Sequence, residues 1–162
     1  MNFVNASNLR RAKSFTAVLI AIVMVLGVML TSVPYVKAEA PYNLAQGRIV
    51  YASSSYGGSS ADTVVDGDSS TRWESEWGVD PQWVYVDLGT VANIQGFHIE
   101  WEGAYATAYQ LQVSNDELNW STVYSTTAGD GGTDDITLSS PVNAKYARIY
   151  CTQRILPAFG YS

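Results

Sequence analysis

The sequence predicts an all-β protein built as an antiparallel sandwich. From residue 42 onward, short segments alternate between apolar and polar side chains, and clusters of Gly, Asp and Asn separate them. No stretch in this part keeps an apolar i, i+3, i+4, i+7 repeat over three turns, so long amphipathic helices are not expected. Strands with one apolar face each pack as two layers around a shared core.

Four segments carry the strand pattern. In residues 83–88, Val84, Val86 and Leu88 point to one face, and the residues between them point to the other. The same alternation predicts strands over residues 94–101, 109–114 and 146–151. Turn chemistry lies between them, at residues 57–58, 66–67, 88–89, 115–116 and 129–132.

The N-terminus has the organisation of an export signal. Arg10, Arg11 and Lys13 precede an apolar run over residues 15–30, and the small residues Val36 and Ala38 follow. These features predict a signal peptide of residues 1–38 and a single domain of residues 39–162. The alternative is an uncleaved membrane anchor, since the apolar run with its flanks could nearly span a bilayer. In both cases the domain is extracytoplasmic, and after cleavage it is secreted.

Charge excludes two classes of partner. Residues 39–162 hold 5 basic and 15 acidic side chains, a net charge of −10. Binding of nucleic acid requires clustered Lys and Arg to neutralise phosphates, and an anionic membrane surface requires the same. The sequence therefore predicts neither nucleic-acid binding nor, after cleavage of the signal, membrane binding.

Few residues are suited to catalysis or to transition-metal binding. One Cys and one His exclude an intrachain disulfide, a Cys-based zinc site and a His-pair metal site. Cys151 alternates with apolar residues and is predicted to lie in the core, whereas His98 is predicted to point outward. Glu100 and Glu102 lie on one face of one strand, so they would not flank a substrate as a glycosidase pair does. We therefore expect no enzymatic activity in this domain.

Aromatic side chains point to sugar binding. All five Trp residues lie in the predicted domain, and residues 72–78 interleave aromatic, basic and acidic side chains in a loop. Sugars stack a C–H face on an aromatic ring and hydrogen-bond to polar neighbours. Trp77 is the candidate platform, although it could instead cover the rim of the core, and Arg72 could contact ligand or form an ion pair across the sandwich. Trp73 and Trp83 are interpreted as core or rim residues.

A tight turn raises the question of a metal. Asp66, Asp68 and Thr71 could supply oxygen ligands to a hard cation such as Ca²⁺. The pattern also fits an ordinary Asp-Gly turn that needs no ion.

These motifs resemble a known family. Residues 43–162 are similar, in family order, to the discoidin or coagulation factor five/eight type C domains, and more closely to bacterial carbohydrate-binding modules of family 32. The most specific stretches read DG-x-x-x-T-R-W at residues 66–73 and Q-W-x-x-V-D-L-G at residues 82–89; the others lie at residues 43–45, 52–54, 101–105, 109–114, 119–120 and 144–149.

The resemblance implies a jelly-roll-like β-sandwich that binds sugar without catalysing a reaction. It implies sugar contacts from Arg72, Trp77 and Glu102, with Tyr56, Tyr105 and Arg154 as further candidates. It also implies a structural Ca²⁺ at the 66–71 turn. Family members continue with a final strand that carries a Glu ligand to Ca²⁺, so an incomplete C-terminus and weakened Ca²⁺ binding are expected here.

The sequence therefore predicts a module that holds an attached or partner enzyme on a polysaccharide, of a β-glucan or chitosan-like type. The carboxylates of Glu74, Glu76 and Glu102 would favour amino sugars. Two alternatives stay open: the chain could be the N-terminal part of a secreted glycoside hydrolase, or a cell-surface adhesion module.

Overall fold

The computed structural model describes residues 42–162, which form one antiparallel sheet of five strands. The predicted signal peptide and the alternative membrane anchor lie outside these residues. The strand order is β1-β2-β5-β3-β4, which confirms the predicted all-β antiparallel class. The elements are β1 (Ile49–Ala52), the 3-10 helix η1 (Ala61–Val65), β2 (Gln82–Glu100), β3 (Ala106–Ser114), β4 (Ser121–Thr126) and β5 (Thr133–Arg154).

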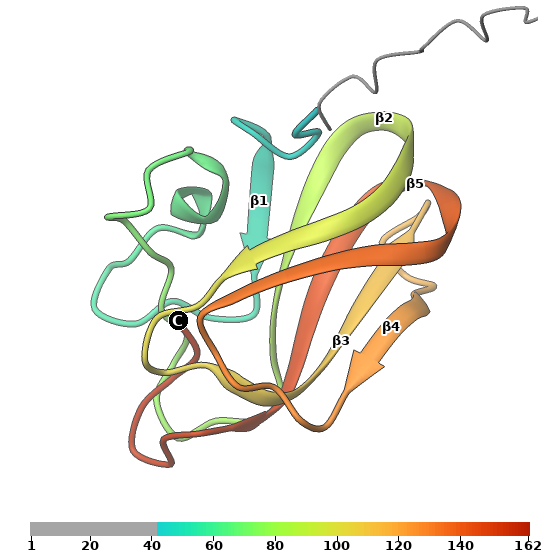
Figure 1. The fold of residues 1–162 in the computed structure, drawn as a ribbon. Helices are drawn as coiled ribbons and strands as arrows, with labels where there is room; N and C mark the ends of the chain where they lie inside the picture. The colour runs from blue at the N-terminus through green and yellow to red at the C-terminus, as the bar shows by residue number, and fades with distance from the viewer. Residues whose placement is uncertain (1–41) are drawn as a thin grey trace, which may run out of the picture. The chain divides into compact units, whose positions relative to one another are not determined.

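Two long, bent strands give the sheet its two layers (Figure 1). Residues 82–87 of β2 pair with residues 146–151 of β5, and residues 96–100 pair with residues 133–137. The register shifts between these two parts, and such irregularities bend a strand. The predicted strands over residues 83–88 and 94–101 are thus the two halves of β2 rather than separate strands.

The core lies between the two layers. Phe97 and Ile99, from the second part of β2, and Ile136, from the first part of β5, pack against a buried cluster that includes Leu111 and Cys151. The predicted inward faces are confirmed, because Val84, Leu88, Leu111, Val113 and Cys151 are all buried. Burial also raises the pKa of the Cys151 thiol, which is the environment expected of an inert core cysteine.

The two tryptophans interpreted as core or rim residues differ. Trp73 is buried in the core cluster, and its indole N–H donates to the carbonyl of Ser54 at 2.9 Å. Trp83 is half-buried and stacks on Tyr85, on the outer face of β2 away from the core. The core interpretation therefore holds for Trp73 only.

Strand β1 lies at the edge of the sheet. Among residues 42–162 it pairs with β2 alone, and Ile49 and Tyr51 on its outer face are 62% and 47% exposed. An edge strand presents unpaired backbone groups to its surroundings. The described part of the chain contains no helix long and apolar enough to cross a membrane.

Candidate functional site

Three aromatic side chains meet at the loop end of the sandwich. The rings of Tyr56 and Trp77 are stacked, with centroids 4.1 Å apart and planes at 18°. Phe159 is tilted against Trp77 at 5.1 Å. Each of the three remains about two-fifths exposed, at 41%, 39% and 41% respectively. Trp77 is thus exposed as predicted, but it belongs to a group of three rings instead of standing alone. We refer to Tyr56, Trp77 and Phe159 as the aromatic cluster.

Hydrogen bonds between two loops position Tyr56 against Trp77. The Tyr56 N–H donates to the Glu74 carbonyl at 2.8 Å, and the Ser59 hydroxyl donates to the same carbonyl at 3.0 Å. Further along, the Glu76 N–H donates to the Ser54 hydroxyl at 2.9 Å. The loop of residues 53–59 is therefore fixed to the loop of residues 72–78, as sugar recognition on a rigid support requires.

Glu74 orients the indole of Trp77. The Trp77 Nε1–H donates to Glu74 Oε1 at 2.6 Å. A hydrogen bond to a carboxylate is stronger than one to a neutral acceptor, so it favours one rotamer of the indole. The second carboxylate oxygen of Glu74 then lies at the border of the aromatic cluster.

The C-terminal segment supplies the third ring. The Ser75 N–H donates to the Tyr161 carbonyl at 3.0 Å, and the Tyr161 N–H donates back to the Ser75 hydroxyl at 2.8 Å. The Gly78 N–H donates to the Phe159 carbonyl at 3.3 Å. Sequence reasoning missed Phe159, because it follows the last strand in a segment without periodicity.

The same segment connects the aromatic cluster with Glu102. The Glu102 N–H donates to the Ser162 carbonyl at 3.1 Å, and the Ser162 N–H donates to the Ala104 carbonyl at 3.0 Å. The Glu102 carboxylate accepts the Ala104 N–H at 3.2 Å and is exposed. Figure 1 shows the C-terminus among these loops. The candidate carboxylate and the aromatic cluster therefore lie at one end of the sandwich.

Tyr105 is half-buried and packs towards Gly131. A Cβ built on Gly131 would lie 2.6 Å from the ring of Tyr105. The carbonyl of Tyr105 accepts the Ile155 N–H at 3.1 Å, which ties this loop to the end of β5. The contacts of Tyr105 are thus those of a loop-packing residue.

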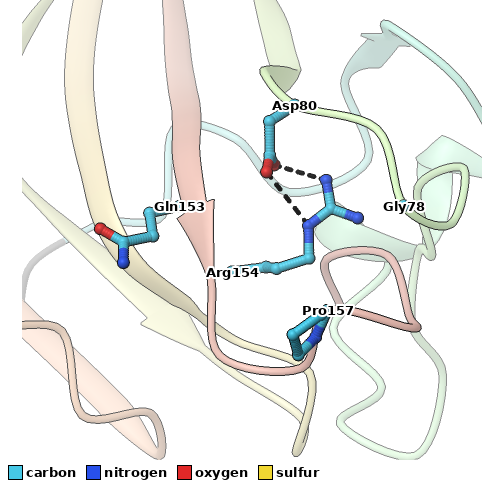
Figure 2. A pocket seen from close by; sticks show the side chains of 5 residues that line it. All are labelled: Gly78, Asp80, Gln153, Arg154 and Pro157. Atoms are coloured by element: carbon cyan, nitrogen blue, oxygen red, sulfur yellow. Dashed lines mark hydrogen bonds and ion pairs between the residues drawn. The ribbon is translucent and has the colours of Figure 1, made fainter.

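Arg154 is held by internal partners. Figure 2 shows its guanidinium against Asp80, with Nε–Oδ2 at 3.2 Å and Nη2–Oδ1 at 2.6 Å. Its Nη1 donates to the Phe159 carbonyl at 2.9 Å, and the side chain is only 6% exposed. Arg154 lines an open hollow of about 340 Å³ with Gly78, Asp80, Gln153 and Pro157.

These contacts show that Arg154 buttresses the segment that carries Phe159. Tyr161 adds to the same network, because its hydroxyl donates to Asp80. Burial and that hydrogen bond raise the pKa of Tyr161 well above its ordinary value, so the donor is retained at any physiological pH. The Arg154 guanidinium therefore supports the aromatic cluster indirectly, because it holds in place the segment that carries Phe159.

Arg72 is in the opposite situation. It is exposed, and within residues 42–162 it takes part in no ion pair. The alternative of an ion pair across the sandwich thus finds no support among the described residues. A free guanidinium can donate two parallel hydrogen bonds to adjacent sugar hydroxyls.

The 66–71 turn is closed by its own hydrogen bonds. Asp66 Oδ1 accepts the Asp68 N–H at 2.8 Å, and Asp66 Oδ2 accepts the Thr71 hydroxyl at 2.7 Å. Asp68 accepts the Ser70 hydroxyl at 2.6 Å, a bond that lowers the pKa of Asp68. The side chains on this tight turn offer oxygen atoms, which are the ligands that a hard cation such as Ca²⁺ prefers. Several of these oxygens already accept hydrogen bonds from N–H or O–H groups within the turn. Among the described residues no group of three His, Cys, Asp or Glu side chains is arranged to hold a metal.

His98 lies on the surface, which confirms its predicted outward orientation. Its ring is placed between two carboxylates. Its Nδ1 is 2.6 Å from Asp135 Oδ1, and its Nε2 is 3.2 Å from Glu100 Oε1. The side chain is 58% exposed. These hydrogen bonds, that to Asp135 first, raise the pKa of His98 above 6.5. Glu100 therefore pairs with His98 and is not directed at a shared substrate with Glu102.

This arrangement predicts a pH-dependent contribution to stability. Because the folded-state pKa of His98 is raised, the contribution is complete below the unfolded-state value of 6.5 and disappears as pH rises through the folded-state value. The wild-type Tm should exceed that of His98→Gln by more at pH 5.5 than at pH 9. Thermal melts at the two pH values measure this difference. If the Tm difference between wild type and His98→Gln is the same at pH 5.5 and pH 9, the charge of His98 contributes nothing to stability through Asp135 and Glu100.

Comparison with known structures places the chain among carbohydrate-binding modules. Chitosan-binding module 1 of the chitosanase/glucanase from Paenibacillus sp. IK-5 is 48% identical, with a TM-score of 0.71, covering 75% of this chain and 93% of the module. Chitosan-binding module 2 of the same enzyme, solved in complex with chitotriose, is also 48% identical, with a TM-score of 0.70 over 74% of this chain and 93% of the module.

A curated relative is far longer. The polysaccharide lyase 8 family protein HylA of Enterococcus faecalis is 30% identical over 98 residues, which are 60% of this chain and 7% of that protein. The sequence profile of the F5/8 type C domain matches residues 49–158. The chain therefore belongs to the F5/8 type C domain family.

Proposed function

We propose that this protein binds carbohydrate at the loop end of the sandwich and catalyses no reaction there. The observation that carries the proposal is the aromatic cluster, whose three rings stay exposed while hydrogen bonds fix the loops that bear them. Exposed aromatic surface with a carboxylate beside it, as Glu74 lies beside Trp77, is an arrangement suited to sugar binding. Two solved chitosan-binding modules of 48% identity support the proposal.

The aromatic cluster would contact the C–H face of a sugar ring. Trp77 has Tyr56 stacked on it, so the exposed surfaces of Tyr56 and Phe159 extend the area available to a ligand. Arg72 and Glu102 would hydrogen-bond to hydroxyl or amino groups around that ring. A site of this size supports affinities in the micromolar to millimolar range, because few polar contacts are made and binding costs rotational and translational freedom.

We infer that amino sugars are the preferred ligands. Glu74, Glu76 and Glu102 outnumber Arg72, and Arg154 is already paired with Asp80, so the loop end carries negative charge. A protonated amine on the sugar would gain from that charge, and the gain should fall with salt because Glu76 and Glu102 are exposed.

The proposed role is to hold an enzyme on its polysaccharide outside the cytoplasm. The residues of the proposed site would bind sugar without reacting with it, and similar domains occur within a chitosanase/glucanase and a polysaccharide lyase family protein. Linking a weak binding module to an enzyme raises the effective concentration of substrate. The enzyme would be fused to this module or associated with it.

We also propose that the 66–71 turn binds Ca²⁺ weakly. Asp66 and Thr71 would supply side-chain oxygens and Asp68 a further oxygen. If Ca²⁺ is present at ten times its Kd, it should stabilise the fold by about 1.4 kcal/mol. The Tm should therefore be higher in Ca²⁺ than in chelator for wild type but not for Asp66→Asn. Equal melting of wild type in both solutions would reject the site.

Affinity electrophoresis tests the proposed function. The purified protein is run in native gels that contain chitosan, mixed-linkage β-glucan or galactan, beside a gel without polysaccharide. Retardation by chitosan, reduced by Glu102→Gln and by added salt, is the expected result. Unretarded migration of folded protein in every gel would contradict sugar binding.

A further inference from the structure

A second group of aromatic side chains, none of them shared with the aromatic cluster, lies on the outer face of the sheet. The cross-strand register aligns Tyr51 of β1 with Tyr85 of β2, and Tyr85 with Arg148 of β5. The adjacent row aligns Trp83 of β2 with Tyr150 of β5. We call these five residues the outer ladder. Their neighbours along each strand are the core-facing residues, so the outer ladder is separate from the core.

The rings of the outer ladder are in mutual contact. Tyr85 is stacked with Tyr51 at 5.0 Å and with Trp83 at 5.4 Å. Trp120, from the loop before β4, is tilted against Tyr85 at 5.4 Å. Tyr85 is buried under this stack, whereas Tyr51 is 47% exposed and Trp83 and Tyr150 are half-buried. The ladder therefore presents aromatic surface to solvent from more than one strand.

Amide groups extend the ladder towards β3. The Arg148 guanidinium lies 3.9 Å above the Trp120 ring and 5.2 Å from the Tyr150 ring, and its Nε donates to Gln112 Oε1 at 2.8 Å. Gln112 Nε2 in turn donates to Gln110 Oε1 at 2.6 Å. Three inter-strand spacings separate β1 from β3 in this sheet, a width of roughly 14 Å. That width exceeds the diameter of one sugar ring.

Charges on this face balance one another. Lys145 Nζ lies 3.7 Å from Asp87 Oδ2, and the Tyr85 hydroxyl donates to Glu117 Oε2 at 2.8 Å. Hydrogen bonds from Tyr146 and Tyr85 lower the pKa of Glu117, so it stays ionised opposite the Arg148 and Lys145 cations. The outer face thus differs from the acidic loop end, and its chemistry suits an uncharged partner.

We propose that the outer ladder is a second carbohydrate-binding surface that takes a segment of a neutral polysaccharide. This inference rests on the proposed function, since it assigns a further surface to the same activity. Aromatic rings interleaved with amide and hydroxyl groups match a ligand with C–H faces and many hydroxyls. The charge balance selects a hexose chain without amino or acid groups, in contrast to the amino sugars of the loop end. Two surfaces on one module would let it bind a polysaccharide at two points.

Two variants test the outer ladder at opposite sides of the sheet. Tyr51→Ala removes an exposed ring from the edge strand, and Gln110→Ala removes an amide from β3, so neither change cuts into the core. Each should weaken binding of soluble mixed-linkage β-glucan about fivefold and leave binding of chitotriose unchanged. Trp77→Ala should show the reverse preference. Tyr42→Ala is the matched control, because this tyrosine is 80% exposed and lies outside the sheet.

The outcomes separate this inference from the proposed function. If Trp77→Ala abolishes binding of both sugars while Tyr51→Ala and Gln110→Ala bind like wild type, the outer ladder is not a binding surface but the loop-end site stands. If wild type binds neither sugar, both proposals fail. If ultracentrifugation shows a dimer that Tyr51→Ala dissociates, the face is a contact between copies and the proposal is overturned.

Discussion

Trp77→Ala is expected to weaken binding of chitosan oligosaccharides about 30-fold. Trp77 is the central ring of the aromatic cluster, in contact with both Tyr56 and Phe159. Its removal deletes stacking surface and also leaves Tyr56 and the Glu74 carboxylate without their partner. Loss of a central aromatic residue at a binding site costs about 2 kcal/mol of binding free energy, which corresponds to an increase in Kd of about 30-fold. Calorimetric titration with chitotriose measures the change.

The matched control for Trp77→Ala is again Tyr42→Ala, which removes an exposed ring that belongs neither to the sheet nor to the aromatic cluster. Thermal melts of both variants verify that they are folded, since Trp77 is partly exposed and contributes little to the core. A Trp77→Ala protein that is folded and binds chitotriose like wild type would remove the aromatic cluster from the site.

Gly160→Ala is expected to cause the largest loss of stability among the substitutions considered. A Cβ at this position would lie 2.1 Å from the Ser75 carbonyl oxygen and 2.7 Å from its hydroxyl. The backbone of residues 75 and 161 is hydrogen-bonded in both directions there, so it cannot move aside without breaking those bonds. Overpacking of this kind costs about 3 kcal/mol, or a fall in Tm of roughly 10 °C. Because Phe159 adjoins Gly160, sugar binding should weaken as well.

Gly103→Ala provides the comparison for this substitution. No atom lies within 4 Å of a Cβ built at Gly103. Its Tm should therefore stay within a few degrees of wild type. Similar melting of the Gly160→Ala and Gly103→Ala proteins would show that the C-terminal segment is not packed tightly against Ser75.

Local alternation was sufficient to predict the fold class. A period of two places Val84 and Leu88 inward and Tyr85 outward, and the structure confirms each placement relative to the core clusters. The continuity of β2 could not be predicted in the same way, because Gly89 indicated a turn after Leu88. Residues on both sides of this stretch pair with β5, up to Asp87 and again from Ala92, so the two parts stay in one sheet, and this pairing depends on residues more than fifty positions away.

The candidate site was predicted in part. The composition of residues 72–78 indicated Trp77, and the motif resemblance added Tyr56, which the structure places on the Trp77 ring. Phe159 could not be found, because its proximity depends on the pairing of residue 161 with Ser75. The ion pair between Arg154 and Asp80 could not be predicted either, because the two residues lie 74 positions apart in the sequence.

The most direct test of the account follows the indole N–H resonances of the isotope-labelled protein during titration with chitotriose. Each described tryptophan has a distinct environment: Trp77 donates to Glu74 at the loop end, and Trp101 donates to Asp134 beside the core. The Trp77 resonance is expected to shift most, while those of Trp73 and Trp101 stay in place. A folded protein whose Trp77 resonance is unmoved by chitotriose, or in which only Trp83 and Trp120 respond to it, would contradict the loop-end site.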